Sequence, residues 1–424
     1  MYHHQAHGNE HRRRTRAWPR RAGRAALTPA AAVRWHRRGD RVAAISVRRA
    51  GVTLGLAGCV LIGAAVAPGE AGPAALAAGH RTGWRIVPSP NGSLPGDNTL
   101  VQVSAGSAAT AWAVGYAGGA GTFRTLVQRW DGARWAVVRS PSPSPFDNVL
   151  AGVAALSRAS AWAVGYDSVN GYHRALIEHW DGTAWRVVPT PRAGPSDSDL
   201  WGVTALSATN AWAVGNENIG AFRFRPLVEH WNGTAWTLVR VPSPPLAGTG
   251  ATLSGIAATS PRNIWAVGNY DTGTRFQPLI EHFNGAHWSL IPAPAPGSAL
   301  LDRISLQAPG NGWAVGARGV APHTQALIMH WNGHHWAPAA SPAISRSGLA
   351  DVLALTPHLA WAVGSYSPRP GVNRTLIERW TGRAWTVTPS PNRRQGSELL
   401  GISGTQQHLW AVGDALTDTL ILRY

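Results

Sequence analysis

The chain has 424 residues, a formal net charge of +17 and one cysteine, and arginine alone supplies its positive charge because the sequence contains no lysine. Residues 1–49 hold 13 arginines and two acidic residues, which gives this leader +11 (13 − 2) and leaves +6 (17 − 11) for the rest of the chain. The net charge therefore describes the leader, and we expect no nucleic-acid-binding surface on the remainder. The one cysteine, Cys59, excludes a disulfide framework.

Residues 50–77 resemble an export signal. They begin, after a pair of arginines, with a long uncharged stretch and end at Ala75-Leu76-Ala77, which fits the small-x-small rule for cleavage. Cleavage there predicts a mature chain that starts at Ala78 and is extracellular or lies in the cell envelope, with membrane contact only during export. Two alternatives stay open: lipidation at Cys59, and an uncleaved anchor, since about 20 apolar residues can span a bilayer. We interpret residues 1–49 as a disordered basic leader or as the result of a start assigned too far upstream.

A tetrapeptide, Trp-Ala-Val-Gly, recurs seven times at a period near 50 residues, with its tryptophans at Trp112, Trp162, Trp212, Trp265, Trp313, Trp361 and Trp410. Each repeat reads as four short strands, which in the second repeat we expect at residues 149–156, 160–166, 174–180 and 184–191. Four strands in a unit of this length are typical of a β-propeller blade. The sequence therefore predicts an all-β, seven-bladed propeller over residues 78–424.

The third and fourth strands of each repeat are predicted to form a tight hairpin. Two aromatic residues stand five positions apart, as at Trp130 and Trp135, and five of six complete copies carry Asp-Gly or Asn-Gly between them. The seventh hairpin is divided between the two ends of the repeat region, because the chain ends at one aromatic position with Tyr424 and Trp84 supplies the other. We therefore expect an N-terminal strand to complete the last blade and close the ring, which removes the open sheet edge.

Two recurring residue sets could be mistaken for ligand sites. The dipeptide Glu-His stands directly before the third-strand aromatic residue, at Glu178-His179, Glu229-His230 and Glu281-His282. One copy per blade spreads these residues around a ring, so we expect them to hydrogen-bond between strands and blades and not to ligate a metal. Of the 22 tryptophans, 20 lie in the repeats at fixed strand positions. We interpret them as packing between blades and not as a sugar-stacking surface.

The repeats resemble a known family of propellers. A second strand that ends in glycine, an aromatic residue in the third strand and a tryptophan in the fourth are similar to kelch-type blades, as in the central domain of galactose oxidase, and the resemblance covers Trp84–Tyr424. Kelch blades usually carry a double glycine, whereas a single one follows Trp-Ala-Val here, as at Gly115 and Gly165. The resemblance implies the fold and leaves the function open.

Motifs for catalysis and cofactors are missing from the sequence. A copper radical site of the galactose-oxidase type needs a cysteine, and the repeats contain none; Asp boxes, calcium loops and Gly-x-Ser-x-Gly are also missing. We therefore expect no cofactor, no metal and no assignable catalytic residue. Loop carboxylates could still converge as a pair for glycosidic cleavage, so a secreted carbohydrate-active enzyme, a glycosidase or a lyase, stays open as the alternative function.

The length variation between repeats indicates where binding should occur. The connection between the second and third strands and the one between blades vary in length, whereas the hairpin spacing is constant, and in a four-stranded blade both variable connections emerge on one face. We predict an exported, monomeric, non-catalytic propeller that binds a protein or a polysaccharide through this loop face. Aromatic residues and arginine favour interfaces, and the candidate ligand-binding residues are Tyr116, Arg124, Tyr166, Tyr172, His173, Arg174, Phe222, Arg223, Arg275 and Phe276.

Overall fold

The computed structural model describes residues 83–424 apart from residues 120–121, 192–196, 222, 245–248 and 394–395. The leader, the signal region and the cleavage position at Ala78 lie outside the described residues. The described part of the chain is built from strands, and none of its residues form a helix long and apolar enough to cross a membrane.

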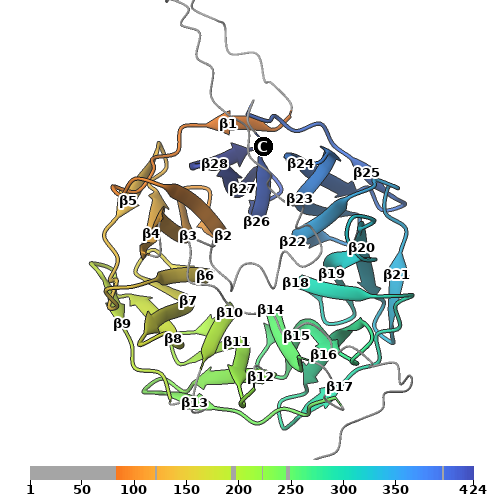
Figure 1. Ribbon diagram of the computed structural model, residues 1–424, viewed down its shortest axis with the longest axis horizontal. Helices are drawn as coiled ribbons and strands as arrows, with labels where there is room; N and C mark the ends of the chain where they lie inside the picture. Colours follow the sequence, from red (N-terminus) through yellow and green to blue (C-terminus); the bar gives the residue numbers. More distant parts are fainter. Residues whose placement is uncertain (1–82, 120–121, 192–196, 222, 245–248, 394–395) are drawn as a thin grey trace, which may run out of the picture. The chain divides into compact units, whose positions relative to one another are not determined.

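The strands form seven antiparallel four-stranded sheets arranged as blades around a central channel (Figure 1). The first, innermost strands are β2 (Asp97–Ser107), β6 (Asn148–Ser157), β10 (Ser198–Ser207), β14 (Ala251–Ser260), β18 (Ala299–Ala308), β22 (Ser347–Thr356) and β26 (Glu398–Thr405). The second strands are β3 (Thr110–Gly119), β7 (Ser160–Val169), β11 (Asn210–Asn218), β15 (Asn263–Asp271), β19 (Asn311–Arg318), β23 (Leu359–Arg369) and β27 (His408–Ala415).

The third strands are β4 (Thr122–Trp130), β8 (Tyr172–Trp180), β12 (Phe224–Trp231), β16 (Phe276–Phe283), β20 (Gln325–Trp331), β24 (Val372–Trp380) and β28 (Asp418–Arg423). The fourth, outermost strands are β5 (Trp135–Val138), β9 (Trp185–Val187), β13 (Trp236–Leu238), β17 (Trp288–Leu290), β21 (Trp336–Ala339), β25 (Trp385–Val387) and β1 (Arg85–Val87). Blade one is β2–β5, the next five blades follow in chain order, and blade seven is β26, β27, β28 and β1.

The predicted seven-bladed architecture is confirmed, and the strand bounds of the second repeat differ mainly in the fourth strand. We expected that strand to reach residue 191, whereas β9 ends at Val187. Pro189 and Pro191 follow it, and proline has no N–H to donate to a sheet. Short outer strands limit the unpaired edge that each blade presents to other chains.

The repeated Trp-Ala-Val-Gly is explained by two features of each blade. Its tryptophan packs against the aromatic pair of the next blade: the ring of Trp112 lies 4.9 Å from that of Trp180 and 5.1 Å from that of Trp185. Its glycine lies beside a bulge in the first strand, where a Cβ on Gly115 would overlap the carbonyl oxygen of Thr99. The same overlap occurs in all seven blades, so the glycine is required by the backbone and the tryptophans pack between blades as expected.

The hairpins between third and fourth strands are confirmed. Their loops are longer than the two-residue loop of the tightest hairpin, since residues 131–134 lie between the paired Trp130 and Trp135 in blade one. Trp130 pairs directly with Trp135, and the side chain of Asp131 accepts hydrogen bonds from the N–H groups of Ala133 (2.8 Å) and Arg134 (2.9 Å). Only the glycine of the pair has a positive φ, 103° at Gly132. The aspartate or asparagine therefore acts as an acceptor for loop amides, and the glycine supplies the left-handed backbone.

The recurring histidines take part in stacks inside their own blades. His230 lies over Trp212 with ring centroids 4.2 Å apart, and its Nε2 is 3.1 Å from Oδ1 of Asn210. The histidines of the second, fourth and fifth blades form the same stack on the tryptophan of their blade, whereas Arg129, Arg379 and Arg423 stack there in the other three. These contacts agree with the structural interpretation of the histidines, whereas the expected hydrogen bonds of the glutamates are absent at Glu229 and Glu281 among the described residues.

The glutamates of the same dipeptides are buried between blades and differ in their partners. Ser140 donates a hydrogen bond of 2.6 Å to Glu178, and Ser341 donates one of 3.1 Å to Glu378. The carboxyl oxygens of Glu229 and Glu281 are buried without a hydrogen-bond partner among the described residues. Burial raises the pKa of each of these two groups to about 8, so both are mostly protonated at neutral pH.

The two ends of the propeller close the ring as predicted. Strand β1 pairs antiparallel with β28, Ile86 opposite Leu422, in the sheet that also contains β26 and β27. The ring of Trp84 is buried and lies 5.6 Å from that of Trp361 and 5.4 Å from that of Tyr424. The N-terminal strand therefore supplies both a sheet edge and the aromatic residue that blade seven lacks.

Deleting residues 83–90 from the full chain should destabilise blade seven. The deletion removes β1 and Trp84, and loss of one buried tryptophan alone costs about 3–5 kcal/mol. We expect a lower melting temperature and self-association through the exposed edge of β28, measured by thermal denaturation and light scattering. Removal of residues 2–9 is the length-matched control. An unchanged melting temperature and mass in the 83–90 deletion would contradict this role for β1.

Candidate functional site

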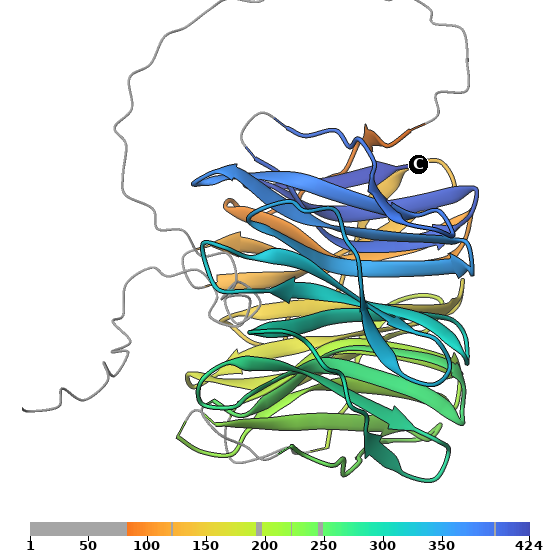
Figure 2. The same cartoon turned by 90° about the vertical axis from the view of Figure 1, so that its right-hand side faces the viewer.

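The variable connections meet on one face of the ring, as expected. In blade two, the N–H of Ser168, at the end of the second strand, donates to the carbonyl oxygen of Asp147, in the connection that enters the blade (2.8 Å). In blade three, Asn218 and Asp197 form the same bond (2.7 Å). Figure 2 views the ring edge-on and shows the strands running between its two faces. We call the face that carries these connections the loop face.

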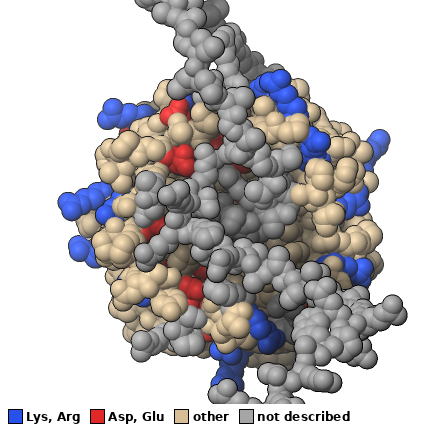
Figure 3. Space-filling model, viewed as in Figure 1, with Lys and Arg blue, Asp and Glu red and all other residues tan. Residues whose placement is uncertain are grey.

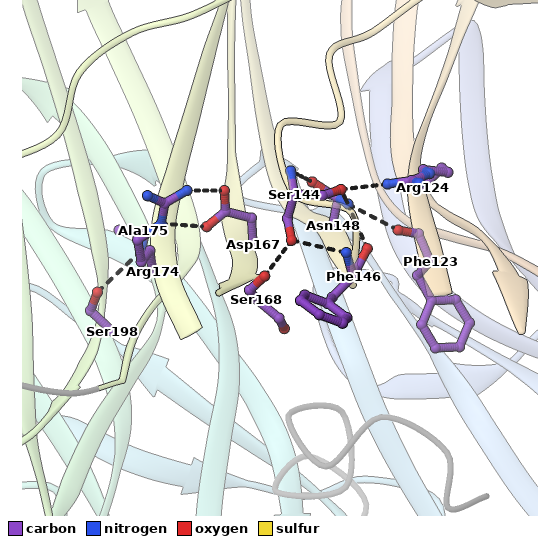
Figure 4. Close-up of polar contacts among 10 residues, drawn as sticks. All are labelled: Phe123, Arg124, Ser144, Phe146, Asn148, Asp167, Ser168, Arg174, Ala175 and Ser198. Atoms are coloured by element: carbon purple, nitrogen blue, oxygen red, sulfur yellow. Dashed lines mark hydrogen bonds and ion pairs between the residues drawn. The ribbon is translucent and has the colours of Figure 1, made fainter. Parts of the chain in front are cut away.

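A hydrogen-bond network fixes the connection between blades one and two (Figure 4). The side-chain amide of Asn148 donates to the carbonyl oxygens of Ser144 (2.9 Å), Phe146 (2.8 Å) and Phe123 (3.2 Å), and its oxygen accepts the N–H of Ser144 (2.9 Å). A guanidinium nitrogen of Arg124 donates to the Ser144 carbonyl as well. The ring of Phe146, 52% exposed, is therefore presented to solvent from a fixed backbone.

Beside this network lie the first three residues of β8, which are Tyr172, His173 and Arg174. Arg174 donates through Nε to Oδ1 of Asp167 (2.9 Å) and through Nη2 to Oδ2 (2.7 Å), a two-point pair with a buried carboxylate, while 59% of the arginine side chain is exposed (Figure 4). The hydrogen bonds to Asp167 raise the pKa of Arg174, and the burial of the guanidinium opposes this rise without cancelling it. Tyr172 is 55% exposed. Phe146, Tyr172 and Arg174 are thus three exposed aromatic and basic side chains at the loop face beside blade two, and we call them the patch over blade two.

A second network connects His173 to the channel. Its Nδ1 lies 2.9 Å from Oδ1 of Asp199, whose Oδ2 accepts a hydrogen bond from the side chain of Asn216 (3.2 Å). Asn216 in turn accepts the indole N–H of Trp201 (2.6 Å). Burial alone would lower the pKa of His173, but the hydrogen bond to Asp199 and the charges of Asp199, Asp197 and Asp147 raise it. The network positions the Trp201 ring at the mouth of the channel.

Two of the candidate residues are buried. Tyr116 contacts Phe123 edge-on at 4.9 Å, and Tyr166 stacks on His173 at 4.2 Å; both tyrosines belong to a core cluster with Trp201. Burial raises the pKa of Tyr166 well above its ordinary value. These rings lie beneath the loop face, so their role is to support the loops.

The other candidates lie over blades three and four. Arg223 and Arg275 are exposed at the tips of the connections, and each closes a turn through its backbone, with the N–H of Ile219 donating to the Arg223 carbonyl (2.8 Å) and that of Thr272 to the Arg275 carbonyl (3.0 Å). Phe276 is half-buried. Phe222 lies outside the described residues. The described candidates thus spread over four neighbouring blades, one to four, and do not meet at one point.

The channel is filled at mid-height by side chains that the sequence interpretation missed. Gln102, Arg303 and Asp351 occupy one equivalent position of the first strand in three blades, directly after the bulge, and glycine occupies it in the other four, at Gly152, Gly202, Gly255 and Gly401. We call this ring of seven positions the girdle. A Cβ on Gly255 would meet the backbone of Arg303, so the glycines leave the space that the three side chains fill.

Arg303 connects four blades across the channel. Its Nη2 donates to the carbonyl oxygens of Ala151 (3.1 Å) and Trp201 (3.2 Å), and its Nη1 donates to those of Ser254 and Asp302. The guanidinium is buried, and these carbonyls replace the water it loses.

Asp351 is the acidic partner in the girdle. Its carboxylate accepts the N–H groups of Val352 (2.9 Å) and Ile402 (2.8 Å). Burial raises the pKa of Asp351 to about 6, while the charge of Arg303 and these hydrogen bonds act in the opposite direction. Above that pH the two charges of the girdle offset each other.

A blind cavity of about 150 Å³ lies above the girdle, at the loop face. The first-strand residues that line this cavity come before the girdle position in the chain. A second cavity is lined by the girdle residues and by the residues that follow them, so it lies below the first. We call the upper cavity the well. Val101, Ala151 and Trp201 line it from blades one to three, and Asp302, Asn373 and Glu398 line it from blades five to seven. One wall is therefore apolar and the opposite wall carries two carboxylates.

Acidic side chains gather on one part of the face seen in Figure 3, over the sheets from β2–β5 to β10–β13. Three buried acidic residues of blades two and three are paired with basic ones: Asp167 with Arg174, Asp199 with His173, and Glu217 with Arg225, whose Nε lies 2.6 Å from Oε1. Among the described residues, no group of three or more His, Cys, Asp or Glu side chains has the geometry to hold a metal ion. The arrangement can bind a ligand by contact and charge.

No family model and no curated protein matches the sequence. Solved structures match most of the chain at low identity. The chain is similar to YCF48 bound to D1 peptide, with 16% identity over 81% of this chain and 96% of that one and a TM-score of 0.53. It is similar to the WD40 β-propeller domain of Doa1, with 11% identity over 81% and 97% of the two chains and a TM-score of 0.52.

A third similar structure is that of a polysaccharide lyase, PL25-Ulvanlyase, with 12% identity over 78% of this chain and 93% of that one and a TM-score of 0.50. These proteins are propellers of different kinds, and none is a kelch protein by its description. At such identities the likeness shows the fold alone: the chain is a seven-bladed β-propeller.

Proposed function

We propose that the protein is a non-catalytic, monomeric binding propeller that recognises a protein or a cell-envelope polysaccharide through its loop face. The observation that carries the proposal is the exposure of Phe146, Tyr172 and Arg174 at the loop face, where the buried side chains of Asn148 and Asp167 hold the backbone of Phe146 and the side chain of Arg174 by hydrogen bonds. Rigid aromatic and arginine side chains on a fixed scaffold provide contact area at a low cost in conformational entropy.

The comparisons support this proposal at the level of the fold. Structures with a similar fold hold a peptide in YCF48 and the saccharide -[GlcA(1-4)Rha3S]- in the lyase, so a ring of this kind accommodates either class of ligand. Two carboxylates of the loop face are engaged in ion pairs, Asp167 with Arg174 and Glu217 with Arg225. Binding without catalysis therefore fits the loop face better than the enzymatic alternative.

The kelch-like relationship and export are part of the proposal. The kelch-like assignment rests on a second strand that ends in glycine and on the aromatic residues of the third and fourth strands, while the single glycine departs from the usual kelch pair. Export rests on the apolar stretch of residues 50–77 and the small residues before Ala78.

The test is a joint replacement on the loop face. The full chain is screened on a glycan array and a peptide array, and the selected ligand is titrated against Phe146→Ala/Tyr172→Ala/Arg223→Ala. We expect a loss of affinity of about tenfold or more, since exposed aromatic and arginine anchors dominate interface energies. Arg174 is left in place because its removal would leave Asp167 buried without its partner.

The matched control is Val137→Ala/Val187→Ala/Arg158→Ala, whose residues are exposed on the rim and on the opposite face. We expect this variant to bind like the parent protein. A loop-face variant that binds as tightly as the parent, with a rim variant that does not, would show that the binding face has been assigned to the wrong side.

A further inference from the structure

Arginine recurs at one position near the start of the third strand, at the loop face. In blade two Arg174 stands there and faces Asp167 across the ladder, with an ion pair of 2.7 Å. In blade three Arg225 faces Glu217 in the same way, at 2.6 Å. An arginine at this position is therefore placed to bind a carboxylate through its guanidinium.

Blade six keeps the arginine and lacks the acidic residue. Arg374 holds the equivalent position, is half-buried and faces Tyr366 across the ladder. Its side chain forms no hydrogen bond or ion pair with any residue that the structure describes. Tyr366 packs against the core between blades five and six, so Arg374, on the same side of the sheet, lies at the seam between these blades. Its donors are left for a group from outside the chain.

A second arginine enters this seam from an unusual backbone position. Arg346 lies in the connection from blade five to blade six and has a φ of 54°. Gly250 and Gly396 hold the equivalent position of blades four and seven with φ values of 95° and 112°. A left-handed backbone costs a residue with a Cβ more than it costs glycine. Blades two and three have Asp147 and Asp197 there, so the charge is reversed in blade six.

The surroundings of these arginines are small and polar. A third, Arg369, is exposed at the turn between β23 and β24, and we call Arg346, Arg369 and Arg374 the blade-six arginines. Among the described side chains, none forms an ion pair with them. No exposed large hydrophobic residue lies in the segments that carry them, 342–346 and 366–374. A protein interface has an apolar centre, so this region fits a charged carbohydrate better than a protein.

We propose that the blade-six arginines bind an acidic polysaccharide whose sugar residues carry carboxylates. A carboxylate of the ligand takes the place at Arg374 that Asp167 occupies at Arg174, and Arg346 and Arg369 attract its neighbours along the polymer. The inference rests on the proposed binding function and narrows the ligand to this class.

The test is arginine footprinting on the full chain, because it reports each arginine separately from those of the basic leader. Phenylglyoxal modifies arginine, and mass spectrometry gives the rate at each position with and without trigalacturonate, a short uronic-acid chain. We expect the blade-six arginines to react about fivefold more slowly with the ligand bound. Arg158 and Arg262, exposed on the opposite face, should keep their rates. No slowing, or equal slowing on both faces, would overturn the proposal.

Two further ligands determine which class is bound. Maltotriose is a neutral sugar and should give no protection, and triglutamate, an acidic peptide, should protect less than trigalacturonate at the same concentration. Protection by triglutamate that equals or exceeds that by the sugar would contradict the polysaccharide assignment and indicate an acidic protein segment.

A double variant identifies the site. Arg346→Gly/Arg374→Gln introduces residues that other blades already have, since glycine has the left-handed backbone in blades four and seven and Gln277 faces Tyr270 in blade four. The fold should be kept, and Arg369 should lose its protection by trigalacturonate. Arg158→Ala/Arg262→Ala removes the same charge from the opposite face and should leave that protection unchanged. Protection of Arg369 that persists in the first variant would refute the assignment.

The outcome separates this inference from the proposed function. If trigalacturonate gives no protection but a ligand from the arrays still depends on Phe146, Tyr172 and Arg223, only the assignment to blade six fails. If protection is found and the array ligand binds the loop-face variant like the parent protein, the blade-six site stands and the patch over blade two is not part of the interface.

Discussion

Replacing Arg303 with methionine should destabilise the propeller by about 3–5 kcal/mol, the usual cost of breaking a buried charge pair on one side. The substitution leaves the carbonyl oxygens of Ala151, Trp201, Ser254 and Asp302 without their donor and leaves Asp351 without the nearby cation. We expect a clear drop in melting temperature at neutral pH, measured by differential scanning calorimetry.

The pH dependence of this variant gives an internal check. Without Arg303 the pKa of Asp351 should rise above its present value of about 6, because the cation that lowers it is gone. A carboxyl with a raised folded-state pKa destabilises the fold fully above that pKa, and the effect declines as the pH falls toward the unfolded-state value of about 4, so part of the lost stability should return at about pH 5. Arg303→Met/Asp351→Asn should recover stability at neutral pH as well.

Arg318→Met is the control for the loss of a partly buried arginine, because Arg318 bonds only the side chain of Gln325 among the described residues (3.2 Å). Its melting temperature should stay close to that of the parent. If Arg303→Met also left the melting temperature unchanged, water would be replacing the guanidinium, and the girdle would not stabilise the ring.

Replacing Glu229 and Glu281 with methionine should stabilise the protein at alkaline pH by several kcal/mol, since a pKa difference of one between the folded and unfolded states corresponds to about 1.4 kcal/mol. Both carboxyls are buried with no hydrogen-bond partner among the described residues, and both have a pKa of about 8. Blade five already carries Met329 at this position, fully buried.

The sign of the effect follows from proton linkage. The folded state holds these protons up to about pH 8, whereas the unfolded chain releases them near pH 4.5, so the stability of the parent protein should fall as pH rises through this window. The double variant should lose much of this slope. Melting temperatures from about pH 5 to 9 measure it, and a variant with the same slope as the parent would show that these two groups do not control it.

Glu178→Met is the matched comparison. Its carboxyl accepts a hydrogen bond from Ser140, five residues after the fourth-strand tryptophan of blade one, whereas Val241 holds the corresponding place before Glu281. Glu178→Met should therefore stabilise less than Glu281→Met, because it also leaves the Ser140 hydroxyl without its acceptor.

The fold could be predicted from the sequence because its signals are local and repeated. The spacing of Trp130 and Trp135 fixes a hairpin register within five residues, and Gly115 follows Trp112 at a distance that one strand determines. Ring closure could also be predicted, since Trp84 and Tyr424 each supply one member of an aromatic pair that every other blade has complete.

The site could be predicted only in part. The alternation of a strand places Tyr166 inward and its burial depends on Trp201 of the next blade, which lies outside the repeat pattern. The girdle is formed by residues about 50 positions apart that meet only across the channel, as Arg303 and Asp351 do. Aligning the repeats shows glycine in four blades at the position of these charges, and that contrast was the signal available in the sequence.

The pairing of β1 with β28 has a consequence for the order in which the protein is made. Among the strands of the described residues, a ribosome produces β1 first and β28 last, so β1 has no sheet partner until β28 has been synthesised. Blades one to six can each assemble from consecutive residues, but blade seven needs contacts more than 300 residues apart, such as the hydrogen bond of 2.6 Å from Ser89 to Thr419. Such long-range contacts form slowly. The ring is therefore an open arc until β28 has been synthesised and can pair with β1.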